Sequence, residues 1–154
     1  MNLESILAPS STQCAVSAKS KKKILEHISE IAAAQIPNQT PQSLLAKLMN
    51  RELMGSTGIG NGIAIPHGRL DNTDKVVAVL LTTETPISFD AIDDKPVDIY
   101  FALFVPENQC QQHLSTLAAI AEVFSDKKNC KLVRKMTSGE ELYHFIIEQK
   151  LNAH

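Results

Sequence analysis

The sequence lacks tryptophan and has few other aromatic residues, which together make up 5% of its 154 residues. A folded core must therefore be built mostly from aliphatic side chains. Hydrophobic residues supply this core at 44%, and charged residues stand at 21%. These proportions are ordinary for a soluble globular protein and exclude an intrinsically disordered chain. The length fits one domain and hardly two.

An excess of one charge is also missing. The chain has 15 basic and 17 acidic residues, for a net charge of −2. Proteins that bind nucleic acid usually carry a basic excess, so no nucleic-acid partner is expected. The longest run of like charge is Lys19 to Lys23, broken by Ser20. We interpret this run as a solvated helix face.

Long hydrophobic runs and paired cysteines are absent as well. No stretch approaches the roughly 18 apolar residues of a membrane helix, and the N-terminal residues do not resemble a signal peptide. We therefore expect a cytoplasmic protein without membrane insertion. Cys14, Cys110 and Cys130 are odd in number and widely spaced, with no CxxC. This spacing predicts three reduced thiols, with neither a disulfide framework nor a metal site.

Apolar periodicity predicts helices toward both ends of the chain and strands between them. Thr40 and Pro41 are suited to begin a helix, as N-cap and first helical residue, and Gly55 is suited to end it. Ser10–Thr12 is interpreted as a loop. Helices, strands and helices in one small domain predict an α/β sandwich with two or three buried strands. The predicted elements are helices over residues 20–36, 41–54, 114–124, 132–136 and 139–146, and strands over 76–81, 87–89 and 97–105.

Residues 55–69, GSTGIGNGIAIPHGR, contain five of the six glycines of the chain. Glycine tolerates positive φ, so such a loop can point several backbone N–H groups at one anion. No Lys follows as in a P-loop, and the spacing is not GxGxxG, so no nucleotide motif is present. A surface turn without a ligand remains an alternative. The candidate anion-binding residues are Ser56, Thr57, Gly58, Gly60 and Gly62.

His67 ends this segment, between Pro66 and Gly68. Because Pro66 pushes Ile65 toward an extended conformation, we expect His67 just past a short strand, exposed on a loop. Histidine can act as a nucleophile, a proton shuttle or a metal ligand. No second His or Cys lies at short ligand spacing, which disfavours a metal. Beside an anion-ready loop, the favoured interpretation is a phosphate-accepting histidine; the alternative is a plain surface residue.

Four stretches of the chain resemble a known family. They are RELM at residues 51–54, MGSTGIGNGIAIPHGR, ETPISFDAIDDKPVDIYFALFVP and HLSTLAAIAEVF. They are similar to type-2 (fructose/mannitol-class) enzyme IIA domains of the bacterial phosphoenolpyruvate-dependent phosphotransferase system, and more narrowly to its nitrogen-regulatory branch, EIIA-Ntr. The resemblance implies a single domain over residues 1–154, with its core at about 3–148, and a mixed β-sheet flanked by helices on both faces.

The same resemblance implies roles for individual residues. The histidine of the IPHG segment, which takes the phosphoryl group in this family, corresponds to His67. The family's arginine before the loop corresponds to Arg51, and its second active-site histidine to His113. Taken alone, Arg51 could instead pair with a nearby acid such as Glu52, and His113 could face solvent. The glycine-rich loop and its two hydroxyl residues, Ser56 and Thr57, would receive the phosphate oxygens.

The function implied is that of a phosphohistidine carrier that needs no cofactor. It would accept phosphate from a small phosphocarrier protein of the HPr or NPr type. Its phosphorylation state would regulate partner proteins, such as potassium-transport regulators, and the balance of nitrogen and carbon. Two alternatives remain open: a sugar-uptake enzyme IIA that passes phosphate to a IIB domain, and a binding module in which His67 is never phosphorylated.

Overall fold

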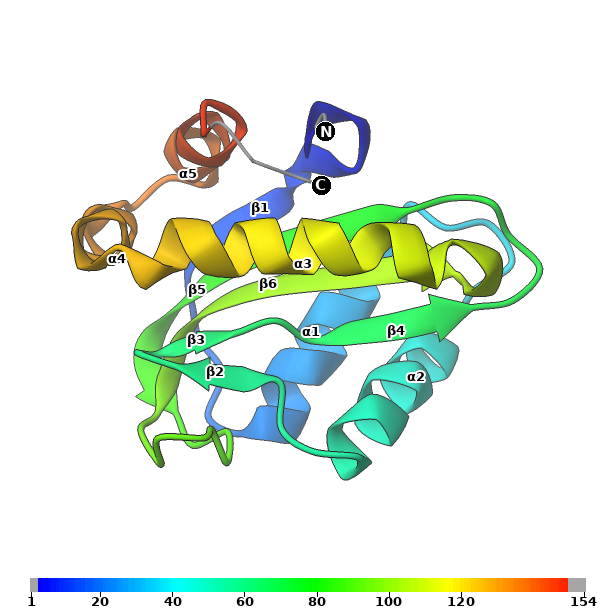
Figure 1. The fold of residues 1–154 in the computed structure, drawn as a ribbon, viewed down its shortest axis with the longest axis horizontal. Coiled ribbons are helices and arrows are strands. Elements are labelled where there is room, and N and C mark those ends of the chain that lie inside the picture. Colours follow the sequence, from blue (N-terminus) through cyan, green and yellow to red (C-terminus); the bar gives the residue numbers. More distant parts are fainter. Residues whose placement is uncertain (1–2, 150–154) are drawn as a thin grey trace.

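A mixed six-stranded sheet runs through the computed structural model, which describes residues 3–149 (Figure 1). The strands are β1 (Leu7–Val16), β2 (Gly58–Gly60), β3 (Ile63–Ala64), β4 (His67–Leu70), β5 (Val77–Ile87) and β6 (Val97–Pro106). β6 pairs antiparallel with β5 and parallel with both β3 and β4. β1 pairs parallel with β5, and β2 pairs with β3. The expected mixed sheet is confirmed; the ends of the expected domain, residues 1–2 and 150–154, lie outside the described residues.

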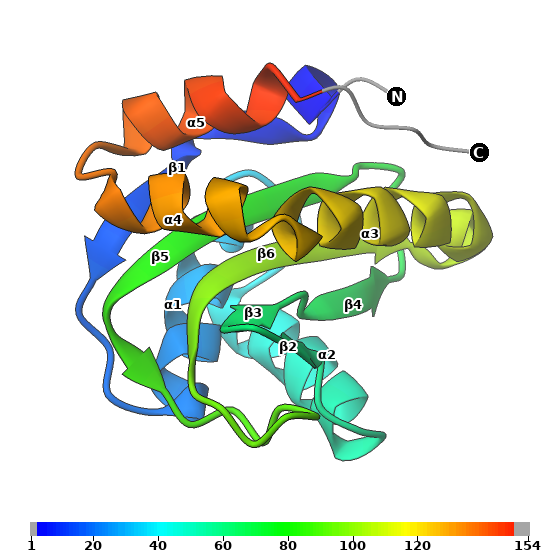
Figure 2. The same cartoon turned by 60° about the vertical axis from the view of Figure 1, so that its left-hand side comes forward.

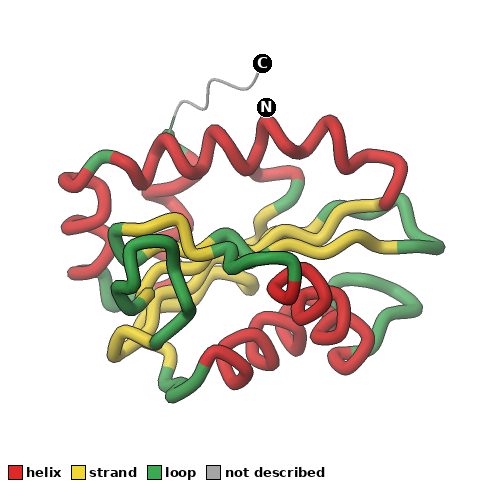
Figure 3. Tube along the Cα trace, turned by 60° about the horizontal axis from the view of Figure 1, so that its bottom comes forward, coloured by secondary structure: helices red, strands yellow, loops and turns green. Residues whose placement is uncertain are grey.

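Helices cover both faces of this sheet, as the resemblance implied. They are α1 (Lys21–Ala33), α2 (Pro41–Leu53), α3 (Cys110–Ser125), α4 (Lys127–Lys135) and α5 (Gly139–Ile147), with short 3₁₀ turns η1 (Leu3–Ser5) and η2 (Glu107–Gln109). α1 and α2 lie on one face, and α3, α4 and α5 lie on the other (Figures 2 and 3). None of the helices within residues 3–149 is long and apolar enough to cross a membrane.

The central strands are apolar on both sides because both sides are covered. On β5, Val79 and Leu81 enter the core under α1 and α2, whereas Ala78 and Leu80 enter the core under α3, α4 and α5. Successive side chains of a strand point to opposite faces, so a strand between two helical layers needs apolar residues at every position. This explains the unbroken apolar run from which the strand was predicted.

Some local predictions are wrong. Ser10–Thr12, interpreted as a loop, lies inside β1, where Ser11 and Thr12 are buried and both hydroxyls donate to the Ala8 carbonyl at 3.1 Å. These local hydrogen bonds satisfy the polar groups that suggested a loop. The separate short strand over 87–89 is not formed: Ile87 is the last residue of β5, and residues 88–89 lie in the connection that follows. The sheet has six strands rather than two or three, because β1 was not predicted and the glycine-rich segment supplies three short strands.

The limits of α2 agree with the sequence and place its last turn at the glycine-rich segment. Thr40 is the N-cap, and its hydroxyl accepts from the Ser43 N–H at 3.0 Å, with Pro41 as the first helical residue. The helix ends at Leu53, and Gly55 follows with φ of +138°. Only glycine adopts such a φ readily, so the chain turns here. Arg51 therefore lies in the last turn of a helix whose end faces the loop.

Candidate functional site

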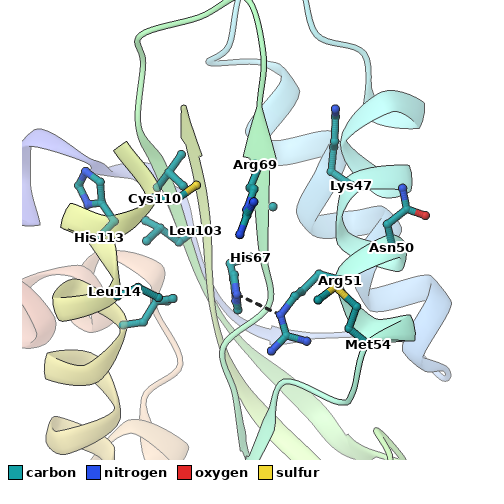
Figure 4. Close-up of a pocket in the computed structure, with 13 residues that line it drawn as sticks. Lys47, Asn50, Arg51, Met54, His67, Arg69, Leu103, Cys110, His113 and Leu114 are labelled. Atoms are coloured by element: carbon teal, nitrogen blue, oxygen red, sulfur yellow. Dashed lines mark hydrogen bonds between the residues drawn. The ribbon is translucent and has the colours of Figure 1, made fainter. Parts of the chain in front are cut away.

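His67 is the first residue of β4 and lines a cavity of about 370 Å³ between α2, β4, β6 and α3 (Figure 4). Arg51 on α2 and His113 on α3 line the same cavity, which we call the histidine pocket. The structure thus brings together the three residues proposed for the chemistry. His67 is half-buried on a strand, rather than exposed on a loop as expected, because residues 67–70 pair with β6.

The two ring nitrogens of His67 have different partners. Nδ1 lies 3.0 Å from the Ile65 carbonyl oxygen, and Nε2 lies 3.2 Å from Nε of Arg51. A carbonyl oxygen can only accept a hydrogen bond, and a guanidinium N–H can only donate one. Nδ1 therefore carries the proton and Nε2 carries the lone pair. One neutral tautomer satisfies both contacts, and its basic nitrogen points toward the arginine.

The surroundings of His67 also favour the neutral ring. Burial lowers the pKa of His67 below its usual value, and the positive charges of Arg51 and Arg69 lower it further. The hydrogen bond to Ile65 and the negative charge of Glu52 raise the pKa, without overcoming the effect of burial. A depressed histidine pKa leaves the nitrogen lone pair available at neutral pH.

Arg51 is fixed by the loop that it faces. Its Nη1 donates to the carbonyl oxygen of Gly55 at 2.8 Å, while its Nε contacts His67. The alternative considered from the sequence, an ion pair with Glu52, is not formed, because Glu52 points to the interior and contacts Lys21 instead. Arg51 therefore presents a planar cation at the acceptor nitrogen, an arrangement suited to binding phosphate oxygens.

His113 lies on the opposite wall of the histidine pocket from Arg51 (Figure 4). Its Nδ1 lies 3.1 Å from the hydroxyl of Thr116, one turn further along α3. This local contact fixes the ring on the helix, and the hydrogen bonds found for His113 among residues 3–149 do not include one to His67. Its supporting role therefore stays a prediction, with any contact to be made through the bound group.

The two loop hydroxyls predicted to bind phosphate are directed inward. Ser56 donates to the Phe89 carbonyl oxygen at 2.7 Å and accepts from the Gly58 N–H at 3.0 Å. Thr57 is buried, and its hydroxyl donates to Glu52 at 2.5 Å. Neither residue lines the histidine pocket. Their geometry gives direct contact with phosphate no support.

The three predicted glycines likewise lie outside the histidine pocket. A Cβ at Gly58 would lie 2.7 Å from that of Ala91, so close packing requires glycine there. Gly60 and Gly62 have φ of +99° and +82°, which favour glycine for the chain path. The glycines are thus needed for a tightly folded turn around β2 and β3, and this turn leads the chain to His67.

Two charged residues lie beneath the site in a role that the sequence did not predict. The Nζ of Lys21 lies 3.0 Å from a carboxylate oxygen of Glu52, whose side chain is only 4% exposed. Lys21 belongs to the run interpreted as a solvated face, so that interpretation is wrong for this residue. A signal for Glu52 was present, because it lies four residues after Leu48 and continues the buried stripe of α2.

A second cavity, of about 480 Å³, is lined by residues around α4 and the ends of β3 and β6. We call it the basic pocket, after its lining residues Lys95, Lys127, Lys131 and Arg134. Arg134 Nε lies 2.8 and 3.0 Å from the two carboxylate oxygens of Asp98, and its Nη2 donates to the Asn61 carbonyl at 2.7 Å. Gly62 lines this pocket rather than the one that contains His67.

Comparison with known proteins gives one consistent result. Residues 5–149 match the family model described as "Phosphoenolpyruvate-dependent sugar phosphotransferase system, EIIA 2". A nitrogen regulatory protein of Escherichia coli is 48% identical over 149 residues, which cover 96% of this chain and 91% of that protein. The crystal structure of nitrogen regulatory protein IIA-Ntr from Neisseria meningitidis superposes with a TM-score of 0.89 at 33% identity, covering 94% of this chain and 98% of that one.

A more distant structural match shares the fold alone. It is the IIA mannitol enzyme of Escherichia coli, solved in complex with phosphorylated IIB. The TM-score is 0.73 at 15% identity, covering 94% of this chain and 100% of that one. The family model spans nearly the whole chain, and the nitrogen regulatory proteins share far more of its sequence. The chain therefore belongs to the EIIA type-2 family of the phosphotransferase system, in its nitrogen-regulatory EIIA-Ntr branch.

Proposed function

We propose that this protein is a phosphohistidine carrier in which Nε2 of His67 accepts the phosphoryl group. The observation that carries the proposal is the pair of contacts on the ring, which leave the lone pair on Nε2 beside Arg51. In the transfer, the N–P bond of the donor's phosphohistidine breaks as a bond from phosphorus to Nε2 forms. The donor's imidazole leaves with the electron pair, and the proton on Nδ1 stays in place.

Arg51 stabilises the transferred group in this proposal. Phosphoryl transfer requires mainly positioning and stabilisation of negative charge on the phosphate oxygens. The new bond uses the lone pair that Arg51 Nε contacts in the free protein, so the arginine exchanges this contact for phosphate oxygens. Its fork can hold two oxygens at once. His113 and Arg69, which line the same pocket, approach the group from other sides.

The donor is a small phosphocarrier protein of the HPr or NPr type. Large apolar side chains are exposed around the mouth of the histidine pocket: Met54 at 83% and Leu114 at 54% both line it, and Leu53, beside Met54, is exposed at 83%. Exposed apolar groups gathered at a site indicate a surface that a partner covers. Transient transfer calls for a small interface, near the lower end of about 1,200–2,000 Å².

The phosphorylation state then regulates partner proteins in the cytoplasm, including regulators of potassium transport and of the nitrogen and carbon balance. A phosphoryl group adds negative charge to a neutral ring at the centre of a contact surface. Such a change can create or abolish binding to a partner. The alternative activity is transfer to a IIB domain, suggested by the mannitol enzyme solved with phosphorylated IIB.

The test is reconstitution with phosphoenolpyruvate, enzyme I and the carrier protein. We expect an acid-labile, base-stable phosphate on His67, and NMR of the ring nitrogens should locate it on Nε2. His113→Ala serves as the matched control, because it removes the second histidine of the same pocket and should leave the label on His67. A wild-type protein that takes no label would be a binding module, and efficient transfer to a IIB domain would indicate sugar uptake.

A further inference from the structure

An ion pair between the buried Glu52 and the partly buried Lys21 lies under the loop that leads to His67. Glu52 faces the interior from the last turn of α2, and Lys21 reaches it from the first turn of α1. The carboxylate also accepts from Thr57, from its N–H at 3.1 Å and from its hydroxyl at 2.5 Å. A buried charge is costly unless it is paired and hydrogen-bonded, and both carboxylate oxygens of Glu52 have partners.

The hydrogen bonds continue from Glu52 to the ring of His67. The carbonyl of Thr57 accepts from the Ile65 N–H at 3.0 Å, and the carbonyl of Ile65 contacts His67 Nδ1. Glu52 is also the neighbour of Arg51, which contacts Nε2. The position of one buried carboxylate is thus linked to both ring nitrogens, through the loop backbone and through the helix end.

Lys21 joins a third segment to the same network. Its Nζ lies 4.5 Å from the centre of the Phe89 ring and 3.5 Å from the Phe89 carbonyl oxygen. The hydroxyl of Ser56 donates to this same carbonyl. Helix α1, the loop after α2 and the connection between β5 and β6 therefore meet at one cation. An ammonium group in this place fixes the loop from two sides.

We propose that Glu52, with Lys21 as its counter-ion, is a positioning residue for phosphorylation of His67. It holds Thr57, and through it Ile65, so that Nδ1 keeps its proton and Nε2 stays at Arg51. A pair that served stability alone could lie anywhere in the core, whereas this one contacts the segment that orients the acceptor ring. The inference rests on the proposed function for its effect on rate, but its effect on the ring can be measured without phosphorylation.

The decisive variants are Glu52→Gln and Lys21→Met. Glu52→Gln keeps the size of the side chain and removes its charge, and Lys21→Met keeps most of the stem and removes the cation. The matched controls are Lys23→Met and Glu26→Gln, because Lys23, which is exposed, and Glu26, which is partly exposed, form a pair on α1, 3.5 Å apart. Lys21→Arg is the conservative variant, since it keeps a cation that can reach Glu52.

Two measurements are made on each variant: ¹⁵N NMR of the His67 ring, for its tautomer and pKa, and the rate of phosphate incorporation. For Glu52→Gln and Lys21→Met we expect loss of the single Nδ1–H tautomer. The rate of phosphate incorporation should fall by about 10- to 100-fold, because a small misplacement of a reacting group lowers the rate by this order. The controls should stay within about twofold, because exposed pairs contribute little. Lys21→Arg should recover most of the rate and the tautomer.

Wild-type tautomer and rate in both decisive variants would overturn the proposal. If wild type itself takes no phosphate, the proposed function fails, whereas the NMR comparison still decides whether Glu52 positions the ring. Should Glu52→Gln fail to unfold cooperatively, Thr57→Val decides the question. It removes one hydrogen bond to Glu52 and leaves the Lys21 ion pair in place, so an unchanged tautomer there would also contradict the proposal.

Discussion

The histidine pocket and the basic pocket lie at opposite ends of α3, and they differ in a way that simple charge counting would misjudge. The basic pocket is larger, at about 480 against 370 Å³, and is lined by four cationic side chains. The side chain of Arg134, however, already donates hydrogen bonds to Asp98 and to the Asn61 carbonyl. The histidine pocket has a neutral ring with its lone pair directed at an arginine. Orientation, rather than the number of charges, distinguishes the pocket suited to chemistry.

The two pockets also differ in the reactivity of the nucleophilic side chain that each contains, Cys130 in the basic pocket and His67 in the histidine pocket. Cys130 lines the basic pocket, but its side chain is buried and donates to the Phe124 carbonyl at 3.1 Å. Burial raises the pKa of the Cys130 thiol, so it stays protonated at neutral pH. Burial acts oppositely on His67, where a lowered pKa leaves the nucleophilic form in place. Burial disfavours the charged form of both groups, so it suppresses the nucleophilic thiolate of cysteine and favours the nucleophilic neutral ring of histidine.

The largest effect on phosphate incorporation is expected from removal of the proposed acceptor, His67. His67→Ala should abolish phosphate incorporation and leave the fold intact, because the ring is half-buried at the wall of a cavity and outside both cores. Cys130→Ala, at the other end of α3, should be labelled at the wild-type rate. Peptide mapping under neutral or basic conditions locates the label, and phosphate on His113 or any other residue of the His67 variant would break the comparison.

Next in size is the loss of an arginine from each pocket. Arg51→Ala should slow incorporation by about 10²–10³, since it removes a preorganised donor beside the acceptor. Arg134→Ala should leave the rate unchanged and lower stability by about 1 kcal/mol, because it removes a partly exposed ion pair. Rates from a phosphorylated carrier and urea denaturation measure the two effects. Equal rates in the two variants would show that the orientation of Arg51 is unimportant.

His113→Ala should have a smaller effect on the rate than Arg51→Ala, about tenfold, with the label still on His67. Its ring contacts Thr116 and lies across the pocket, so it acts only on the bound group. The ratio of rates for the two variants measures how unequally the opposite walls contribute. A larger loss in His113→Ala than in Arg51→Ala would reverse the assignment of the principal donor.

The pH dependence gives a further contrast. The pKa of His67 is lowered in the folded protein, so the unfolded chain binds this proton first as the pH falls. The stabilisation is therefore present above the unfolded pKa of about 6.5 and is lost as the pH falls through the folded pKa. Urea denaturation at pH 7.5 and 5.5 measures how far the free energy of unfolding falls between the two pH values. This fall should be smaller in His67→Gln than in wild type, and unchanged in Arg134→Ala. An unchanged pH dependence in His67→Gln would argue against the lowered pKa.

The smallest effect is expected at an exposed rim. Arg69→Glu reverses an exposed charge at the histidine pocket and should change the association rate of the carrier, and its salt dependence, by several-fold. Lys131→Glu makes the matched reversal at the basic pocket and should change neither. Stopped-flow transfer at several ionic strengths measures both variants. If only Lys131→Glu alters the kinetics, the carrier docks at the other end of α3.

The sequence predicted the elements and the principal residues of the site better than the contacts of the loop. Periodicity and caps located α1 and α2, and the family motifs supplied the residues that the fold gathers around His67. The direction of Thr57 could not be predicted, because it depends on Glu52 being buried, which depends in turn on Lys21 from another helix. The strands β2 and β4, with three and four residues, are too short to show a period, whereas the extended segment at β3 was expected from Pro66.

The pairing of β4 with β6 has a consequence for the order of folding. The acceptor ring needs α2, β4, β6 and α3, which are drawn from residues 41–125, and the parallel pairing joins His67 to Leu103 across a long intervening chain. Contacts between residues so distant in sequence form only after a costly loop closure. In the proposed function, a refolding or newly made chain therefore becomes able to take phosphate only when its central sheet is complete.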